Sequence, residues 1–245
     1  MNRIDRFGVM FGRLSLPLWP LRARAHEPEL LDLPDLDAAE LRANLRELAL
    51  LNRLPGGAAT SIRAIDRLAG DDEISILDVG TGGGDLPLAF ARHGRGRWRV
   101  IASDSRPQIL DLAAAWTTAQ PLVTTLLADG RQLPLGDGEV DVAHASLVLH
   151  HLDPAAAAVV LSEMRRVSRR GVVINDLQRG VLAFAVTALV TATLARSRYT
   201  RHDGILSARR AYTLGELDGM LDEAGLRPVW RSSTLVPRVV TAAVA

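Results

Sequence analysis

Short apolar stretches alternate with amphipathic segments along most of the chain. The apolar stretches lie at residues 74–77, 98–102, 122–127, 140–146 and 172–175. Turn or capping residues follow them, which is typical of strands buried in a sheet. The segments between them carry apolar residues at helical spacing. Strands that alternate with helices in this way predict an α/β fold with a doubly wound, mostly parallel sheet.

Capping residues and prolines mark where several helices begin. Residues 37–40, Asp-Ala-Ala-Glu, form a predicted capping box ahead of a helix with leucines at helical spacing. Pro154 stands at the first position of another helix, behind the capping residue Asp153. Two β-like stretches, 226–232 and 235–244, follow the last helix and finish the chain.

Residues 1–34 differ from the rest because they are basic, rich in proline and without a clear helical pattern. We predict a loosely ordered arm or linker there, which could contact a membrane or the body of the protein. An apolar run at 14–21 follows several arginines, but Pro17 and Pro20 interrupt it, so we expect no signal peptide. Residues 35–245 are expected to form one domain.

A second apolar stretch, Val181 to Ala195, is fifteen residues long and falls short of the roughly 20 residues that span a bilayer. It predicts a buried or interfacial helix. The basic segment from Arg196 to Arg210 comes next, and we expect it to be a loop. Residues 213–216 then cap one more helix.

Composition excludes several classes of function. The chain has 245 residues and a formal net charge of +1, so charge gives no reason to expect a nucleic-acid partner. Aromatic residues make up 4%, which also argues against platforms that stack bases. The absence of cysteine excludes disulfides, thiolate zinc sites and cysteine nucleophiles. It is compatible with a reducing cytoplasm, and we expect a cytoplasmic protein.

Residues 77–85, Leu-Asp-Val-Gly-Thr-Gly-Gly-Gly-Asp, join an apolar strand to a helix through a glycine-rich turn. Such a turn lets a cofactor lie against bare backbone at a helix N-terminus. A nicotinamide or flavin dehydrogenase would need a third glycine at position 85. The residue there is Asp85, whose carboxylate would repel a diphosphate. Taken alone, the glycines could serve only a tight strand-to-helix turn.

The spacing that is present, Asp-x-Gly-x-Gly-x-Gly from Asp78, resembles the signature of the class I S-adenosylmethionine-dependent methyltransferases. The resemblance extends from about Leu41 to the C-terminus. It implies a Rossmann-like fold, with a doubly wound, mostly parallel seven-stranded sheet and an antiparallel C-terminal hairpin. The cofactor would be S-adenosylmethionine, which carries no phosphate. Residues 35–70 would form an N-terminal helical lid, although plain core packing explains their two helices equally well.

In a sheet of this kind, ligands bind beyond the carboxyl ends of the strands. Asp104 follows Gly80 by 24 residues, the interval expected of an acid that accepts from ribose hydroxyls. The resemblance implies that Asp129 accepts from the adenine amine and that Asp78 holds the methionine ammonium. Each aspartate taken singly could be a solvated turn or a helix cap. The predicted cofactor-binding residues are Asp78, Gly80, Thr81, Gly82, Gly84, Asp104, Ser105, Asp129, Gly130 and Ser146.

The segment after the fourth strand bears on the acceptor. Residues 146–151 lack the Asn/Asp-Pro-Pro-aromatic pattern of enzymes that methylate nucleobase amines, and resemble the small-molecule branch of the family. A phenol ionises near pH ~10, so it benefits from a base that works near neutrality. His150 or His151, assisted by Asp176 after the fifth strand, is the predicted base. The alternative is that a histidine here only caps or packs.

A metal site is conceivable but disfavoured. The side chains that could suggest one are His151, Asp153, Asp176, His202 and Asp203. Enzymes of the catechol type bind Mg²⁺ through acids at the ends of strands four and five. Here the fourth strand ends in histidines, which suit Mg²⁺ badly. We therefore expect no metal.

Residues 177–212 form an insertion of the kind that builds the acceptor pocket in this family. The apolar helix at 181–195 would supply an apolar wall, with Phe184 or Leu189 facing the acceptor. A polar entrance would come from Arg196, Arg198, Arg201, His202, Arg209 and Arg210. Residues 173–177 and 200–204 resemble bacterial methyltransferases of type III polyketide and quinone pathways.

The sequence thus predicts S-adenosylmethionine-dependent O-methylation of a small lipophilic phenol, quinol or polyketide. Two alternatives stay open, namely C-methylation of a quinone precursor and a catalytically silent scaffold that only binds the cofactor. The expected partner is a small lipophilic acceptor, and nucleic acid is not expected. The sequence does not specify the acceptor or the oligomeric state.

Overall fold

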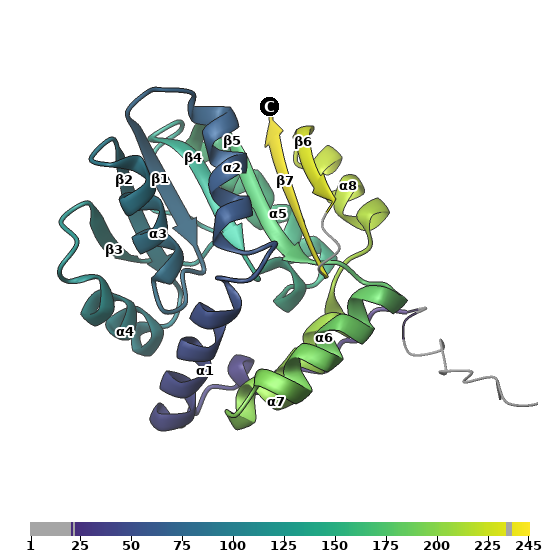
Figure 1. Cartoon of the computed structure of the whole chain (residues 1–245). Helices are drawn as coiled ribbons and strands as arrows, with labels where there is room; N and C mark the ends of the chain where they lie inside the picture. Colours follow the sequence, from purple (N-terminus) through teal and green to yellow (C-terminus); the bar gives the residue numbers. More distant parts are fainter. Residues whose placement is uncertain (1–20, 22, 234–236) are drawn as a thin grey trace, which may run out of the picture.

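The computed structural model describes residue 21, residues 23–233 and residues 237–245. Most of the predicted arm, residues 1–20 and 22, lies outside the described residues. A seven-stranded sheet runs through the molecule in the order β3-β2-β1-β4-β5-β7-β6 (Figure 1). Its strands are β1 (Ile74–Val79), β2 (Trp98–Asp104), β3 (Val123–Leu127), β4 (Val140–Ser146), β5 (Ser168–Leu177), β6 (Arg227–Ser233) and β7 (Arg238–Val244).

The sheet has the predicted mixture of directions. Strands β1 to β5 pair in parallel, whereas β7 runs antiparallel to both β5 and β6. The fold class predicted from the sequence, with its antiparallel C-terminal hairpin, is therefore confirmed. The strand order reverses between β1 and β4, so their carboxyl ends flank the crevice where open α/β sheets bind ligands.

Helices cover both faces of the sheet. On one face, α2 (Ala58–Ala69) and α3 (Asp85–Gly94) bury Ile65 and Phe90 against the strands. On the other face, α5 (Pro154–Val167) and α8 (Leu214–Glu223) bury Leu161 and Leu221. Because both faces are covered, the central strands are apolar along almost their whole length, which explains their continuous apolar runs.

A second helical group lies beyond the carboxyl ends of the strands (Figure 1). It contains α1 (Ala38–Leu51), α6 (Val181–Leu194) and α7 (Arg198–Arg210), and α7 packs against the other two. A small apolar cluster of Leu41, Leu45 and Tyr199 joins α1 and α7 to Ile109 of α4 (Pro107–Thr117). This group stands opposite the crevice and closes it from the far side.

The prediction of a loop at residues 196–210 is wrong, because most of that segment is α7. The Ser197 hydroxyl caps it by accepting from the backbone N–H groups of Tyr199 and Thr200. The side chains of Tyr199, Leu206 and Ala208 are buried, while the many arginines mask this apolar pattern in the sequence. A chain segment dense in cations can still be an amphipathic helix.

The predicted capping box at residues 37–40 is only half formed. The Asp37 carboxylate accepts from Ala39 and Glu40, as expected of an N-cap. The Glu40 carboxylate instead accepts from the Ser197 hydroxyl and the Arg198 backbone N–H. It thereby places a negative charge at the N-terminus of α7, where the helix dipole favours one.

Among the described residues, no helix is both long enough and apolar enough to cross a membrane.

Candidate active site

A cavity of about 670 Å³ lies between the carboxyl ends of the central strands and the helical group. One part is lined by the glycine-rich loop and the end of β2, and we call it the loop half. The other part is lined by α1, α6, α7 and the segment after β4, and we call it the helix half. The two halves meet at Ser146 and Val148, which follow β4 and also line the cavity.

The glycine-rich loop presents bare backbone to the loop half. Gly80, Thr81 and Gly82 line the cavity, as predicted. Gly80 has φ +68°, and a Cβ there would lie 2.5 Å from a methyl carbon of Val148, so no larger residue fits. Gly84 does not line the cavity. It begins α3 at φ +76° and packs tightly against Thr117, which gives it a structural role.

Asp104 faces the loop half at the end of β2. Its carboxylate accepts from the Gly82 N–H at 3.3 Å and from the Arg106 N–H at 3.0 Å. Burial raises the pKa of Asp104, although these N–H groups act in the opposite direction. Asp104 and Ser105 both line the cavity, so the structure brings this predicted pair to the loop half.

Asp78 lies beneath the loop and does not line the cavity. Its carboxylate accepts from the Thr81 hydroxyl at 2.7 Å and lies 2.6 Å from Nδ1 of His144. The Nε2 of His144 in turn lies 2.9 Å from the Ser61 hydroxyl. Asp78 is 1% exposed, so in this arrangement it holds the loop in place through Thr81.

Asp129 and Gly130 also stand outside the cavity lining. The Asp129 carboxylate is partly exposed and binds the Arg131 guanidinium, whose Nη2 lies 2.6 Å away. This hydrogen-bonded pairing lowers the pKa of Asp129. Gly130 packs against Val79 and Val160. The sequence suggested a cavity-facing acid here, but an arginine two residues later takes up the carboxylate. The predicted contact with adenine stays a prediction.

Asp85, which argued against a diphosphate, does line the cavity. Its carboxylate accepts from the Asn52 side-chain amide at 2.9 Å, and the Asn52 oxygen accepts from Arg238 at 2.8 Å. Burial raises the pKa of Asp85 and lowers the pKa of Arg238 to about 10. Sequence reasoning did not include Asn52 or Arg238, since nothing in their local pattern distinguishes them.

His150 and Asp176 meet in the helix half, as expected for residues that follow adjacent strands. Nδ1 of His150 lies 2.6 Å from the Asp176 carboxylate, which also accepts from the Leu149 N–H at 2.8 Å. Burial would raise the pKa of Asp176, but the charge and hydrogen bond of His150 outweigh it and the pKa is lowered. His150 is 2% exposed and lines the cavity, whereas Asp176 supports it from behind.

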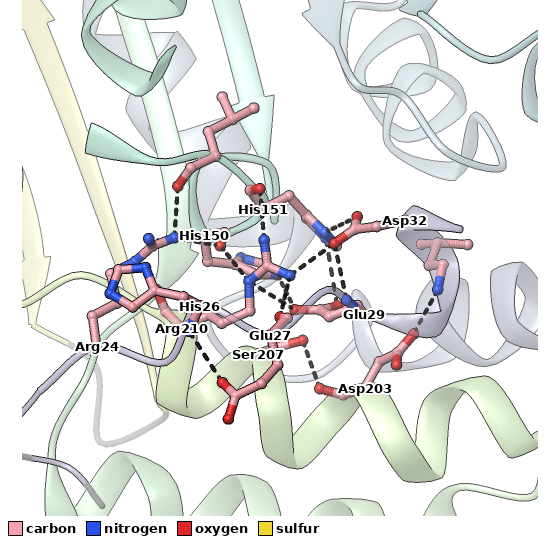
Figure 2. A network of polar contacts seen from close by, with 12 residues as sticks. Arg24, His26, Glu27, Glu29, Asp32, His150, His151, Asp203, Ser207 and Arg210 are labelled. Carbon is pink, nitrogen blue, oxygen red and sulfur yellow. Dashed lines mark hydrogen bonds and ion pairs between the residues drawn. The ribbon is translucent and has the colours of Figure 1, made fainter. Parts of the chain in front are cut away.

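Residues 24–33, which we call the strap, lie along the helix half (Figure 2). The Asp203 carboxylate on α7 accepts from the backbone N–H groups of Leu30 and Leu31 at 2.8 and 3.0 Å. Arg210 donates to the Glu27 carbonyl and to Asp32, at 2.9 and 2.8 Å. This part of the predicted arm therefore contacts the body of the protein.

Two further arginines tie the strap to both halves of the cavity. The Arg24 guanidinium donates to the carbonyls of His150 and Leu152 at 2.7 and 2.6 Å. Arg106, at the start of α4, donates to the carbonyls of Leu31 and Leu33. Because its guanidinium is bonded to the strap, Arg106 is not free to bind a phosphate in the loop half.

Glu29 carries the strap's most unusual side chain. It is 2% exposed, and its two carboxylate oxygens lie 3.8 Å from Nε2 of His150 and 3.8 Å from Nε2 of His151 (Figure 2). Its Oε1 accepts no hydrogen bond from any residue that the structure describes. A buried carboxylate is costly unless nearby positive charge offsets it, and nitrogens of His151 and Arg210 lie 3.8 and 3.9 Å from the Glu29 carboxylate.

His151 differs from His150 in its surroundings. Its Nδ1 lies 2.7 Å from the Asp32 carboxylate, and its side chain is 21% exposed. Burial would lower the pKa of His151, but the charges of Glu29 and Asp32 outweigh it and raise the pKa to about 9. In turn, burial would raise the pKa of Asp32, but the hydrogen bond and the charge of His151 act in the opposite direction and that pKa is lowered. His151 is therefore cationic at neutral pH and balances two acids of the strap.

Glu29, His150 and His151 are also the described residues that could surround a metal ion, with ligand atoms within 4.8 Å of one another. A guanidinium nitrogen of Arg210 lies 3.9 Å from the Glu29 carboxylate and already supplies positive charge there. The group weighed from the sequence is not assembled, since Asp153 caps α5 and Asp203 binds the strap. The expectation of no metal stays a prediction.

The predicted polar entrance needs correction. Of its six residues only Arg210 lines the cavity. Four others line a separate surface groove with Leu30 and Glu40; they are Arg196, Arg198, Arg201 and His202. Because residues 196–210 were predicted to be a loop, their side chains could not be assigned to the two sides of a helix.

The apolar wall is likewise built from different residues. Thr187, Val190 and Thr191 of α6 line the cavity, whereas Phe184 and Leu189 do not. Leu189 is 65% exposed on the opposite side of the helix. The sequence is apolar around the whole helix, so it could not show which side faces inward.

A family model described as a methyltransferase domain matches residues 76–171. An uncharacterized 37.1 kDa protein in a transposon of Streptomyces fradiae is 35% identical over 128 residues, which are 52% of this chain and 35% of that protein. The uncharacterized methyltransferase sll0829 of Synechocystis is 31% identical over 107 residues, 44% of this chain and 48% of its own length. The chain thus spans half or less of these relatives.

A solved structure shares the fold over most of the chain. A SAM-dependent methyltransferase from Aquifex aeolicus superposes with a TM-score of 0.62 at 17% identity, over 85% of this chain and 98% of that one. The matched domain contains the glycine-rich loop, Asp104 and His150. The strap, α6 and α7 lie outside it, so the helix half is built largely by segments that the family model does not match.

Proposed function

We propose that this chain, a class I methyltransferase by its domain and its fold, methylates a small lipophilic acceptor with S-adenosylmethionine. The favoured reaction is O-methylation of a phenol, quinol or polyketide hydroxyl. The observation that carries the proposal is the division of one cavity into two chemically different halves. The loop half, which suits a cofactor, opens directly onto an apolar helix half that contains a buried histidine–carboxylate pair.

The loop half suits S-adenosylmethionine and not a dinucleotide. Backbone from Gly80 to Gly83 forms a bare wall, and the Asp104 carboxylate stands where ribose hydroxyls could donate to it. Asp85 would repel a diphosphate but tolerates an ammonium or a sulfonium. The cofactor supplies a methyl group on a positively charged sulfur, which makes that carbon electrophilic.

The helix half supplies the acceptor's environment. Leu48, Leu51 and Leu54 of α1 and its C-terminal turn face the cavity together with Val190 of α6. These side chains favour an apolar body, while His150, His151 and Glu29 gather at the polar end. A small number of polar groups in an otherwise apolar pocket is the usual means of fixing a ligand's orientation. A lipophilic molecule with one oxygenated end fits this arrangement.

The proposed chemistry is an in-line displacement. A lone pair of the acceptor oxygen attacks the methyl carbon while the carbon–sulfur bond breaks and its electron pair stays on sulfur. The hydroxyl proton passes to Nε2 of His150. Asp176, bonded to Nδ1, holds the ring and stabilises the imidazolium that forms. Positioning carries most of the rate, and the base adds to it.

The His150–Asp176 pair also favours an enzyme over a silent scaffold. Burying a histidine and a carboxylate together costs free energy unless their hydrogen bonds offset the loss of solvation. Here Asp176 is bonded to His150 and to backbone N–H groups, while Nε2 is left toward the cavity. A module that only binds the cofactor would need no such group in its other half.

Ligand-induced stabilisation tests the cofactor assignment. A ligand that binds only the folded protein stabilises it by RT ln(1 + L/Kd), where L is the ligand concentration, so the melting temperature rises with the logarithm of L above Kd. We expect S-adenosylhomocysteine to raise the Tm and NAD and NADP to leave it unchanged. Stabilisation by NAD or NADP alone would refute the assignment.

A further inference from the structure

Helix α6 has two apolar sides, and the cavity accounts for only one of them. Thr187, Val190 and Thr191 line the cavity. The opposite side, which we call the α6 outer face, consists of Val181, Leu182, Ala185, Leu189, Ala192 and Thr193. At 3.6 residues per turn these six positions fall within an arc of about 120°. They form a continuous stripe along the helix.

The α6 outer face is exposed. Leu182 and Leu189 are each 65% exposed and Val181 is 48% exposed. No charged residue occurs between Arg179 and Arg196, so nothing polar except threonine interrupts the stripe. Four of the ten large apolar side chains that stand exposed in the described part of the chain belong to this one helix, and three of them (Val181, Leu182 and Leu189) lie on the α6 outer face. A contiguous exposed apolar patch of this kind marks an interaction surface.

Cations stand at the C-terminal end of the same helix. Arg196, Arg198, Arg201 and His202 line the surface groove together with Leu30 and Glu40. The guanidinium groups of the three arginines form no ion pair with any residue that the structure describes. The neighbouring acids are already engaged, since Glu40 and Glu47 accept from backbone N–H groups at the start of α7.

We propose that the α6 outer face and this arginine cluster dock on an anionic lipid bilayer. An apolar stripe beside exposed arginines matches both layers of such a surface, with the leucines toward the acyl chains and the arginines toward the headgroups. No described helix crosses a membrane, so the chain would lie on the bilayer. The charge of the cluster favours this partner over another protein's neutral apolar face.

Docking in this way would give the enzyme access to a lipophilic acceptor in the bilayer, a purpose that rests on the proposed function. Only the thickness of α6 separates the outer face from Val190 and Thr191 in the cavity wall. A lipophilic acceptor concentrates in a bilayer, so a docked enzyme would meet it there. The docking itself is independent of methyl transfer and can be measured without an acceptor.

Vesicle binding of the full chain tests the proposal. The chain has no cysteine, so single cysteines at Leu182 or Leu189 can carry an environment-sensitive fluorophore. The probes are vesicles of phosphatidylcholine alone and vesicles that also contain about 30% phosphatidylglycerol, an anionic lipid. Val229, an apolar residue that is 56% exposed on β6, provides the matched control position.

We expect co-sedimentation with the anionic vesicles and a blue shift of the fluorophore at 182 and 189 but not at 229. Leu182→Ser with Leu189→Ser should weaken partitioning at least about tenfold, whereas Val229→Ser should not. Replacing Arg196, Arg198 and Arg201 by glutamine should remove the preference for anionic lipid, at roughly fivefold per arginine. A cooperative thermal unfolding transition, measured by circular dichroism on every variant, confirms that each one is folded.

Three results would overturn the proposal. One is absence of partitioning by a folded protein at millimolar lipid. Another is partitioning that the α6 variants do not change. The third is a fluorophore at 182 or 189 that is already shielded from water without vesicles. Shielding that grows with protein concentration would indicate a second copy of the chain, and shielding independent of concentration would indicate residues of the same chain. None of these bears on cofactor binding, so the proposed function would be judged separately.

Discussion

The two halves of the cavity are built from contacts of very different range along the chain. In the loop half, Gly82 donates to Asp104 across 22 residues, and Ser103 donates to the Asp78 carbonyl across 25. In the helix half, His151 meets Asp32 across 119 residues and Leu30 meets Asp203 across 173. One half is thus a local unit of two neighbouring strands, while the other depends on the strap reaching its place.

The comparison teaches how the two tasks are separated. The loop half is formed by β1, β2 and the turn between β1 and α3, and the two strands pair directly with each other. The helix half requires the strap, α7 and the segment after β4 to come together around Glu29, His150 and His151. Substitutions in one half should therefore mainly change the binding or turnover of the ligand held there and leave the ligand in the other half nearly unaffected.

The largest effect is expected at His150. His150→Ala removes the proposed proton acceptor and should lower kcat by roughly 10²–10⁴. The affinity for S-adenosylhomocysteine, measured by calorimetry, should stay within about twofold, since His150 lies in the other half. His151→Ala is the control and should cost less. A larger loss for His151, or an equal loss of cofactor affinity, would refute this division of roles.

The next effect is expected in the loop half. Asp104→Ala should weaken S-adenosylhomocysteine binding by roughly 10- to 150-fold, since it removes charge-assisted hydrogen bonds worth about 1.5–3 kcal/mol. The kcat at saturating cofactor should change little. Calorimetry provides the measurement.

Asp129→Ala is the matched control, because the Asp129 carboxylate is bonded to Arg131 outside the cavity. We expect it to change the affinity by less than about twofold. A larger loss at Asp129 than at Asp104 would show that the adenine contact predicted from the sequence forms in the complex, and that the loop half rearranges on binding.

The sequence predicted most of the loop half because its signals are local. Gly80, Thr81 and Gly82 follow an apolar strand directly, and Asp104 stands at a fixed interval on the next strand. Two predicted contacts there, those of Asp78 and Asp129 with the cofactor, stay predictions because other side chains bond these carboxylates in the structure. Arg131 takes up Asp129, and Thr81 with His144 encloses Asp78. Side-chain pairing of this kind leaves no trace in the strand pattern.

The helix half could be predicted only in part. His150 and Asp176 follow adjacent strands, so their meeting was predictable from the strand order. Glu29 was not, because nothing within the proline-rich start of the chain connects it to a histidine more than a hundred residues later. The faces of α6 and α7 were hidden for a different reason. One helix is apolar all round, and the other carries so many arginines that its buried positions do not stand out.

The smallest expected effect concerns the charge balance around Glu29. The pKa of His151 is raised from 6.5 to about 9 in the folded protein, so its contribution to stability is complete below pH 6.5 and lost as the pH rises through 9. The free energy of unfolding should fall over that range by about 1–3 kcal/mol, since the ring is partly exposed.

Glu29→Gln removes one of the two acids that raise this pKa and should make the decline with pH shallower. Urea unfolding at several values between pH 6 and pH 10 measures it. His151→Ala is the control and should abolish this part of the pH dependence. An unchanged decline in Glu29→Gln would mean that the strap does not hold Glu29 against the histidines in solution.

The central claim is methyl transfer to an oxygenated lipophilic acceptor held beside His150. The most direct measurement incubates the full chain with methyl-labelled S-adenosylmethionine and a panel of alkyl phenols, quinols and hydroxylated polyketides, followed by mass spectrometry. We predict a product that carries the labelled methyl on oxygen, formed far more slowly by His150→Ala. A labelled methyl on a ring carbon would contradict O-methylation. Absence of any product from a protein that binds S-adenosylhomocysteine would contradict the assignment of an enzyme acting on these acceptors.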